Sequence, residues 1–216
     1  AGAMSSMFKA PVAAIVFAVE IFSLDLVFTS LVPLLLASIA AVITSYFFRG
    51  TDVLFSFELL DVWRVKDIIF YVFLGLATGI ASVYFSKMYF LITRFFGWFS
   101  NAYVKIGIAA LAIGLMLYLF PPLYGEGYGL INNLLNGNTE VALSGIQYQI
   151  DFNNVWTVIA ILLLIAVFKA IAMTTTFAAG GVGGIFIPTL FMGSALGNSV
   201  AKVINQFGFE VSESNF

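Results

Sequence analysis

Glycines crowd one stretch of an otherwise apolar sequence, AAGGVGGIFIPTLF over residues 178–191. Glycine has no Cβ, so backbone N–H groups in such a stretch can turn toward a ligand. A helix that begins just after them adds unpaired N–H groups and the positive end of its dipole, which together bind anions. Pro188 suits the first turn of such a helix. Close packing of two membrane helices through small residues explains the same glycines equally well, so both interpretations stay open at this stage.

Two charged residues, Glu20 and Lys169, lie in apolar surroundings. Glu20 ends an apolar run, where a carboxylate is functional by default; a structural, water-facing carboxylate is the alternative. Lys169 lies inside an apolar segment, where it could add positive potential to an anion pathway. It could also snorkel, extending its ammonium group to water along the aliphatic stem, and we expect this second behaviour. Glu126, within YGEGYG, indicates turn chemistry in an exposed loop.

The sequence offers little equipment for acid–base catalysis or for binding metals. It has no His and no Cys, and no pair of carboxylates lies inside an apolar segment. We therefore expect no enzyme activity, no metal site and no cofactor. The net charge of −2, without a dense Lys/Arg cluster, gives no electrostatic footprint for nucleic acid.

Composition sets the class of protein. Hydrophobic residues make up 62% of the 216 residues and charged residues 9%, and the mean hydropathy is +1.06. Soluble domains are about half apolar and a quarter charged, so lipid must be the solvent for most of this surface. The sequence predicts an all-α integral membrane protein that crosses a lipid bilayer several times, with no soluble domain.

Apolar segments of uneven length run through this single transmembrane domain, which we expect to cover residues 1–216. A perpendicular helix needs about 20 residues to span a bilayer, and several segments are shorter or longer. This mixture indicates helices that stop inside the membrane, where freed backbone groups line a cavity. In the last segment we expect two short helices, Pro188–Leu196 and Gly197–Phe207. The expected spans are 8–22, 25–48, 68–98, 102–120, 155–177 and 188–207.

Three motifs resemble the CLC family of chloride channels and proton/chloride antiporters. GGIFIP (183–188) is similar to the family's G-x-F-x-P anion-filter motif, and FKAPVAAIVFAVEIF (8–22) resembles its F-x-A-P helix. PPLYGEGYGLINNLL (121–135) resembles the loop and short helix between those two motifs. The three follow the family's order and cover essentially the whole chain, which makes the resemblance fairly specific.

The resemblance implies a function and a fold. Backbone N–H groups of Ile185 and Phe186, with Gly184 beside them, would coordinate a chloride ion, and Gly183 and Pro188 would complete the motif. Chloride would be the substrate, and protons would be a second partner in an antiporter. The fold would be a partial inverted-repeat core of broken, tilted helices, in a multi-pass protein of the cell (inner) membrane that forms homodimers through membrane helices.

Parts of the family pattern are absent from these residues. The G-S-G-I-P and G-[KR]-E-G-P segments, which supply an inner serine and a gating glutamate, would lie upstream, and a pore-closing tyrosine would lie downstream. We therefore expect both ends of the chain to be truncated. In proton-coupled members a glutamate follows the position that matches Glu20, and here that residue is Ile21, which favours a channel. A fluoride-exporting relative and a non-transporting membrane fragment or scaffold are the alternatives.

Overall fold

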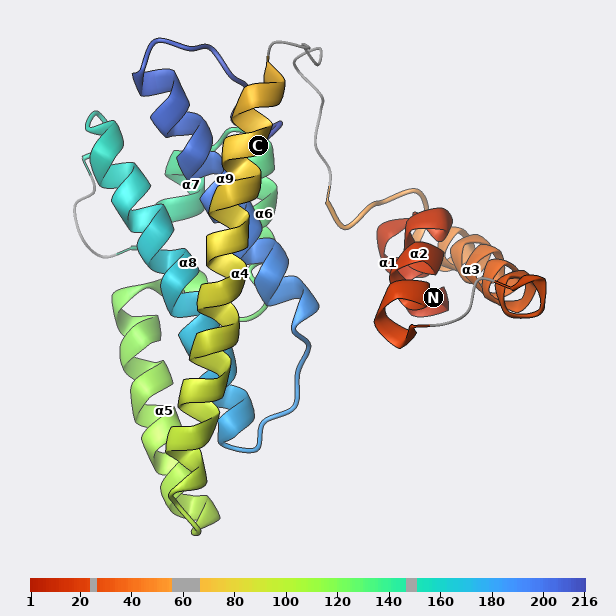
Figure 1. Ribbon diagram of the computed structural model, residues 1–216, viewed down its shortest axis with the longest axis horizontal. Coiled ribbons are helices and arrows are strands. Elements are labelled where there is room, and N and C mark those ends of the chain that lie inside the picture. The colour runs from red at the N-terminus through yellow and green to blue at the C-terminus, as the bar shows by residue number, and fades with distance from the viewer. Residues whose placement is uncertain (24–26, 56–66, 147–150) are drawn as a thin grey trace. The chain divides into compact units, whose positions relative to one another are not determined.

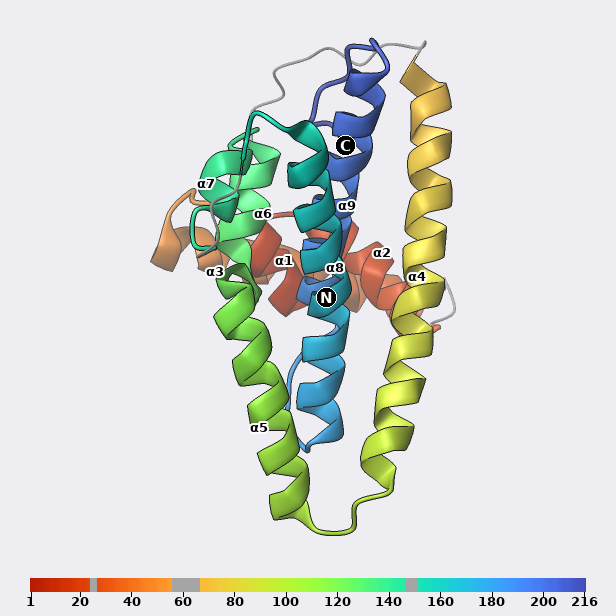
Figure 2. The same ribbon diagram turned by 90° about the vertical axis from the view of Figure 1, so that its left-hand side faces the viewer.

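The computed structural model describes residues 1–23, 27–55, 67–146 and 151–216. The described residues are helical, with no strand among them. The chain forms two compact units, Ala1–Ser56 and Phe57–Phe216, which are considered separately below. Figures 1 and 2 show the helices of each unit from two sides.

The first unit contains α1 (Gly2–Phe8), α2 (Pro11–Phe22) and α3 (Phe28–Arg49). The expected segment 8–22 is thus interrupted at its start: α1 ends at Phe8, and Lys9 takes a left-handed conformation with φ 54°. Pro11 cannot donate the N–H that a continuous helix would need, so a new helix begins there. The segment expected at 25–48 begins as a helix only at Phe28, and residues 24–26 lie outside the described residues.

Small residues and one lysine hold this unit together. The buried Ser5 hydroxyl donates a hydrogen bond to the Ser38 carbonyl oxygen over 2.9 Å, which joins α1 to α3. The Lys9 ammonium donates to Ser45 Oγ over 2.8 Å and to the Gly50 carbonyl oxygen over 3.1 Å. It also lies 4.3 Å from the centre of the Tyr46 ring. The turn between α1 and α2 is therefore fixed to the C-terminal end of α3.

The second unit is built around α8 (Val155–Ala178) and α9 (Phe186–Gln206), with α4 (Ile68–Gly97) and α5 (Ala102–Leu119) on either side of α8 (Figure 2). The Tyr84 hydroxyl of α4 donates to the Val167 carbonyl oxygen of α8 over 3.1 Å. The short elements between α5 and α8 are η2 (Pro121–Leu123), α6 (Tyr128–Leu135) and α7 (Thr139–Leu143), and α6 packs on α9. These bounds follow the segments expected at 68–98, 102–120 and 155–177 within two residues.

The prediction of two short helices in 188–207 is wrong, because α9 is one continuous helix of 21 residues. Gly197 does not end it: a Cβ at this position would overlap the carbonyl oxygen of Phe216. Gly197 is therefore the point where the C-terminal segment lies directly against the helix. The backbone of the C-terminal segment approaches the backbone of α9 closely here, and only glycine, which has no Cβ, leaves room for it.

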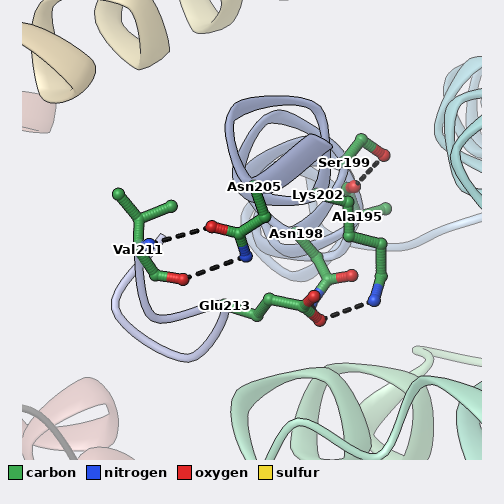
Figure 3. Close-up of polar contacts among 7 residues, drawn as sticks. All are labelled: Ala195, Asn198, Ser199, Lys202, Asn205, Val211 and Glu213. Atoms are coloured by element: carbon green, nitrogen blue, oxygen red, sulfur yellow. Dashed lines mark hydrogen bonds and ion pairs between the residues drawn. The ribbon is translucent and has the colours of Figure 1, made fainter. Parts of the chain in front are cut away.

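Polar side chains of α9 hold that C-terminal segment in place (Figure 3). The Asn205 side chain accepts a hydrogen bond from the Val211 N–H over 2.8 Å and donates one to the Val211 carbonyl oxygen over 3.1 Å. Lys202 forms an ion pair with Glu213 over 2.6 Å. The segment after α9 therefore folds back along the helix that it leaves.

Among the described residues, four helices are long and apolar enough to cross a membrane, and they lie in α3, α4, α5 and α8. None of the most apolar window of α4 is buried within the structure, whereas 39% of that of α8 is buried. An apolar helix surface that is not covered by protein requires lipid as its solvent. The fold is that of an all-α integral membrane protein.

Candidate functional site

The glycine stretch forms the connection between α8 and α9. Each of the first two glycines has a local reason: Gly180 has φ +99°, where an L side chain is strained, and a Cβ on Gly181 would lie 2.8 Å from the Thr176 carbonyl oxygen. The Gly181 N–H donates to that same oxygen over 2.9 Å and closes the end of α8. These two glycines therefore turn the chain, and the next two are left to shape the loop.

The following residues leave backbone donors available. The N–H groups of Gly183, Gly184 and Ile185 donate no hydrogen bond to the described part of the chain. Ile185 is the N-cap of α9, and its side chain makes no capping bond. A Cβ on Gly184 would have no atom within 4 Å, so the space beside this residue is open. The combination of unpaired N–H groups and a helix start is the arrangement that attracts anions.

The first turn of α9 contains Phe186 and Pro188, both partly buried. The Thr189 N–H donates to the Ile185 carbonyl oxygen over 3.1 Å, which makes Ile185 the first acceptor of the helix. The Thr189 hydroxyl donates to the Phe186 carbonyl oxygen over 2.7 Å. The carbonyls of this turn thus point along the helix away from the glycines, and the dipole places its positive end at the loop.

The expectation that Lys169 snorkels to water is wrong. Its exposed fraction is 3%, and its ammonium group donates to the carbonyl oxygens of Leu123 (3.1 Å) and Gly125 (2.8 Å). The ammonium also lies 4.5 Å from the centre of the Phe191 ring in α9. The two loop carbonyls satisfy two of the three ammonium donors inside the protein, so the side chain has no need to reach water. The sequence signal was the isolated lysine; the loop that receives it was not predicted.

Glu126, in that same loop, is exposed. Burial, and next the hydrogen bond and the negative charge of Glu126, raise the pKa of Tyr128 to about 12. Tyr128 begins α6, whose eight residues are too few to span a membrane. The phenol therefore stays protonated at physiological pH near the Glu126 carboxylate, which is consistent with a structural role for this glutamate.

Glu20 and Ile21 lie in the other unit, at the C-terminal end of α2. Both side chains are exposed, and the exposed fraction of Ile21 is 60%. The N–H of Ser23, which is in the left-handed conformation, donates to the Glu20 carbonyl oxygen and closes the helix. No group of three or more His, Cys, Asp or Glu residues in the described ranges could hold a metal ion.

The sequence model of a protein family described as voltage gated chloride channel matches residues 1–215. The chain belongs to this family. Among the relatives of this chain, a protein named putative chloride channel protein ClcB-like, of Ralstonia nicotianae, is 28% identical over 91% of the chain and 42% of its own length. The H(+)/Cl(-) exchange transporter ClcA of Vibrio campbellii is 28% identical over 91% of the chain and 40% of its own length.

The voltage-gated ClC-type chloride channel ClcB of Salmonella typhimurium is 24% identical over 94% of the chain and 45% of its own length. The chain thus spans less than half the length of these relatives. No solved structure matches it. Both proteins named as channels and a protein named as an exchange transporter are among these relatives.

Proposed function

We propose that the protein containing this chain transports chloride across the cell (inner) membrane, and that the GGIFIP loop is one wall of its anion site. Backbone N–H groups of Ile185 and Phe186 would coordinate the ion, and Gly184 would leave room for it. The observation that carries this proposal is the uncapped start of α9 beside the N–H groups of Gly183, Gly184 and Ile185, which donate to nothing in the described chain. Coordination by neutral dipoles binds an ion without holding it too tightly to leave.

The proposal extends to the architecture of the whole protein and to its mode of transport. Both units would form part of one multi-pass transmembrane domain of broken helices, and two copies of the whole protein would form a homodimer in the bilayer. Residue Ile21, exposed and unable to carry a proton, favours a channel over a proton-coupled antiporter. Glu20 beside it would serve as a vestibule carboxylate.

Gly184→Leu in the full-length protein tests the site. A Cβ at this position would have no atom within 4 Å, so a leucine side chain would extend from the loop into open space. We expect chloride affinity, measured by calorimetry, to fall about tenfold or more, because loss of one hydrogen bond to a charged group costs about 1.5–3 kcal/mol. The unfolding temperature in detergent should stay near that of the wild type.

Gly75→Leu is the matched control, since Gly75 in α4 also has no atom within 4 Å of a Cβ. It should bind chloride like the wild type. Unchanged chloride affinity in a folded Gly184→Leu variant would remove the site from this loop. The same titration with fluoride separates chloride transport from the fluoride-exporting alternative, and absence of any anion binding would favour a non-transporting scaffold.

A further inference from the structure

Lys169 carries a buried charge that the described residues do not neutralise by contact. Its two hydrogen-bond acceptors, the carbonyls of Leu123 and Gly125, are uncharged, and its third neighbour is the face of the Phe191 ring. No carboxylate in the described part of the chain lies within ion-pair distance of it. Glu126 acts on it at longer range and is exposed, so water screens its charge. By contrast, Lys202 is paired with Glu213.

The partners of Lys169 suit a cation. Two carbonyl oxygens and an aromatic face present the negative ends of their charge distributions to the ammonium group. The phenylalanine is fully buried, and the lysine is nearly so. Water does not reach a charge held in this way. Its field is therefore screened less than the field of a charge on the surface.

The position of Lys169 relates it to the anion loop. It touches α9 at Phe191, five residues after Phe186, and a helix rises about 1.5 Å per residue. The ammonium therefore lies on the order of 10 Å from the start of α9. Lys169 lies in α8 and its neighbour Phe191 lies in α9. The glycine loop joins these same two helices.

We propose that Lys169 sets the anion affinity of the GGIFIP loop through its field, without touching the ion. This inference rests on the proposed function of the loop. A unit charge about 10 Å away at an effective dielectric constant of about 20 changes the binding constant of a monovalent anion roughly tenfold. The effect depends on charge alone, so it must be nearly the same for chloride and bromide.

Three variants of the full-length protein test this inference by calorimetric titration with chloride and with bromide. Lys169→Met keeps the aliphatic length and removes the charge, and Lys169→Arg keeps the charge. Lys202→Met is the matched control: it removes a lysine from α9 that lies 16 residues after Phe186 and is already paired with Glu213. We expect Lys169→Met to weaken both anions roughly tenfold with their affinity ratio unchanged, and the other two variants to stay within about twofold of the wild type.

The outcomes separate a field from a structural role. A folded Lys169→Met variant with wild-type affinity overturns the inference. So does one that changes the chloride-to-bromide ratio, because a distorted loop and not a lost charge would then explain the loss. If Lys169→Met does not fold, Lys169→Gln decides, because its side-chain amide can still donate to the loop carbonyls but carries no charge: it should weaken chloride binding roughly tenfold, and wild-type affinity in this variant overturns the inference.

The Gly184→Leu variant keeps the two proposals apart. If it loses chloride binding while Lys169→Met does not, only the role of Lys169 fails. If Gly184→Leu binds chloride like the wild type, the loop is not the site and the proposed function fails, whatever the lysine variants do.

Discussion

At the residue scale, Gly127 shows how a single hydrogen atom in place of a side chain fixes the packing around the loop. Its φ is +84°, and a Cβ at this position would overlap the ring of Phe191 in α9. Both features exclude other residues: the left-handed conformation strains an L side chain, and the buried ring cannot give way. The glycine therefore lets the loop approach the same ring that faces Lys169.

Gly127→Ala should lower the free energy of unfolding of the full-length protein by about 2–4 kcal/mol, as the sum of backbone strain and overpacking. The measurement is denaturant unfolding in detergent micelles. Gly129→Ala, two residues later in α6, is the control, because nothing lies within 4 Å of a Cβ there. It should leave the free energy of unfolding unchanged or raise it by up to about 1 kcal/mol. Equal stability of the two variants would contradict the proposed contact.

The sequence predicts the turn and the helix start at GGIFIP better than the contacts that surround them. GGIFIP predicts a turn followed by the start of a helix, because glycines indicate a turn and Pro188 indicates the first turn of a helix. The burial of Lys169 depends on carbonyls 44 and 46 residues away, and no periodicity in the sequence encodes such a contact. That is why snorkelling was the natural expectation for this residue.

At the element scale, the bounds of α4, α5 and α8 could be predicted because each is a long apolar run with a clear stop, such as Pro121 after α5. α9 could not, since its continuity depends on the segment that packs against Gly197. The break between α1 and α2 is a local signal, Pro11, that the apolar run around it obscured. Tertiary contacts override local pattern where a glycine serves packing.

Asn205→Leu should release the segment that folds back on α9, because it removes both hydrogen bonds to the Val211 backbone. We expect amide hydrogen exchange in residues 211–216 to become about tenfold faster or more, since two bonds contribute about 1 kcal/mol each. Exchange in α8 should not change. Gln206→Leu, at the exposed neighbouring position, is the control; equally fast exchange there would assign the effect to the helix end in general.

At the scale of the whole molecule, composition was sufficient to predict an all-α membrane protein, and the three motifs were sufficient for the family. Local motifs do not predict how the two units are arranged relative to each other. Proton coupling is likewise a property of the whole protein, because it requires a proton path in addition to the anion site.

For the full-length protein in liposomes, we expect a chloride gradient to drive chloride flux without stoichiometric proton movement, because Ile21 offers no proton-accepting group. Ile21→Glu places a carboxylate at an exposed position that the fold tolerates, and it should increase proton movement, recorded with a pH-sensitive dye. Ile21→Gln controls for polarity alone. Stoichiometric proton pumping by the wild type would show that the protein is an antiporter.

The lysine at the α1–α2 turn has a mechanical consequence. Lys9 ties that turn to Ser45 and to the Gly50 carbonyl, and hydrogen bonds from a charged donor contribute about 1.5–3 kcal/mol each. α2, which carries Glu20, begins only two residues later. Any displacement of the start of α2 against α3 must break these hydrogen bonds. We therefore expect α1, α2 and α3 to move together as one rigid body. The hinge of any such motion must lie outside the α1–α2 turn.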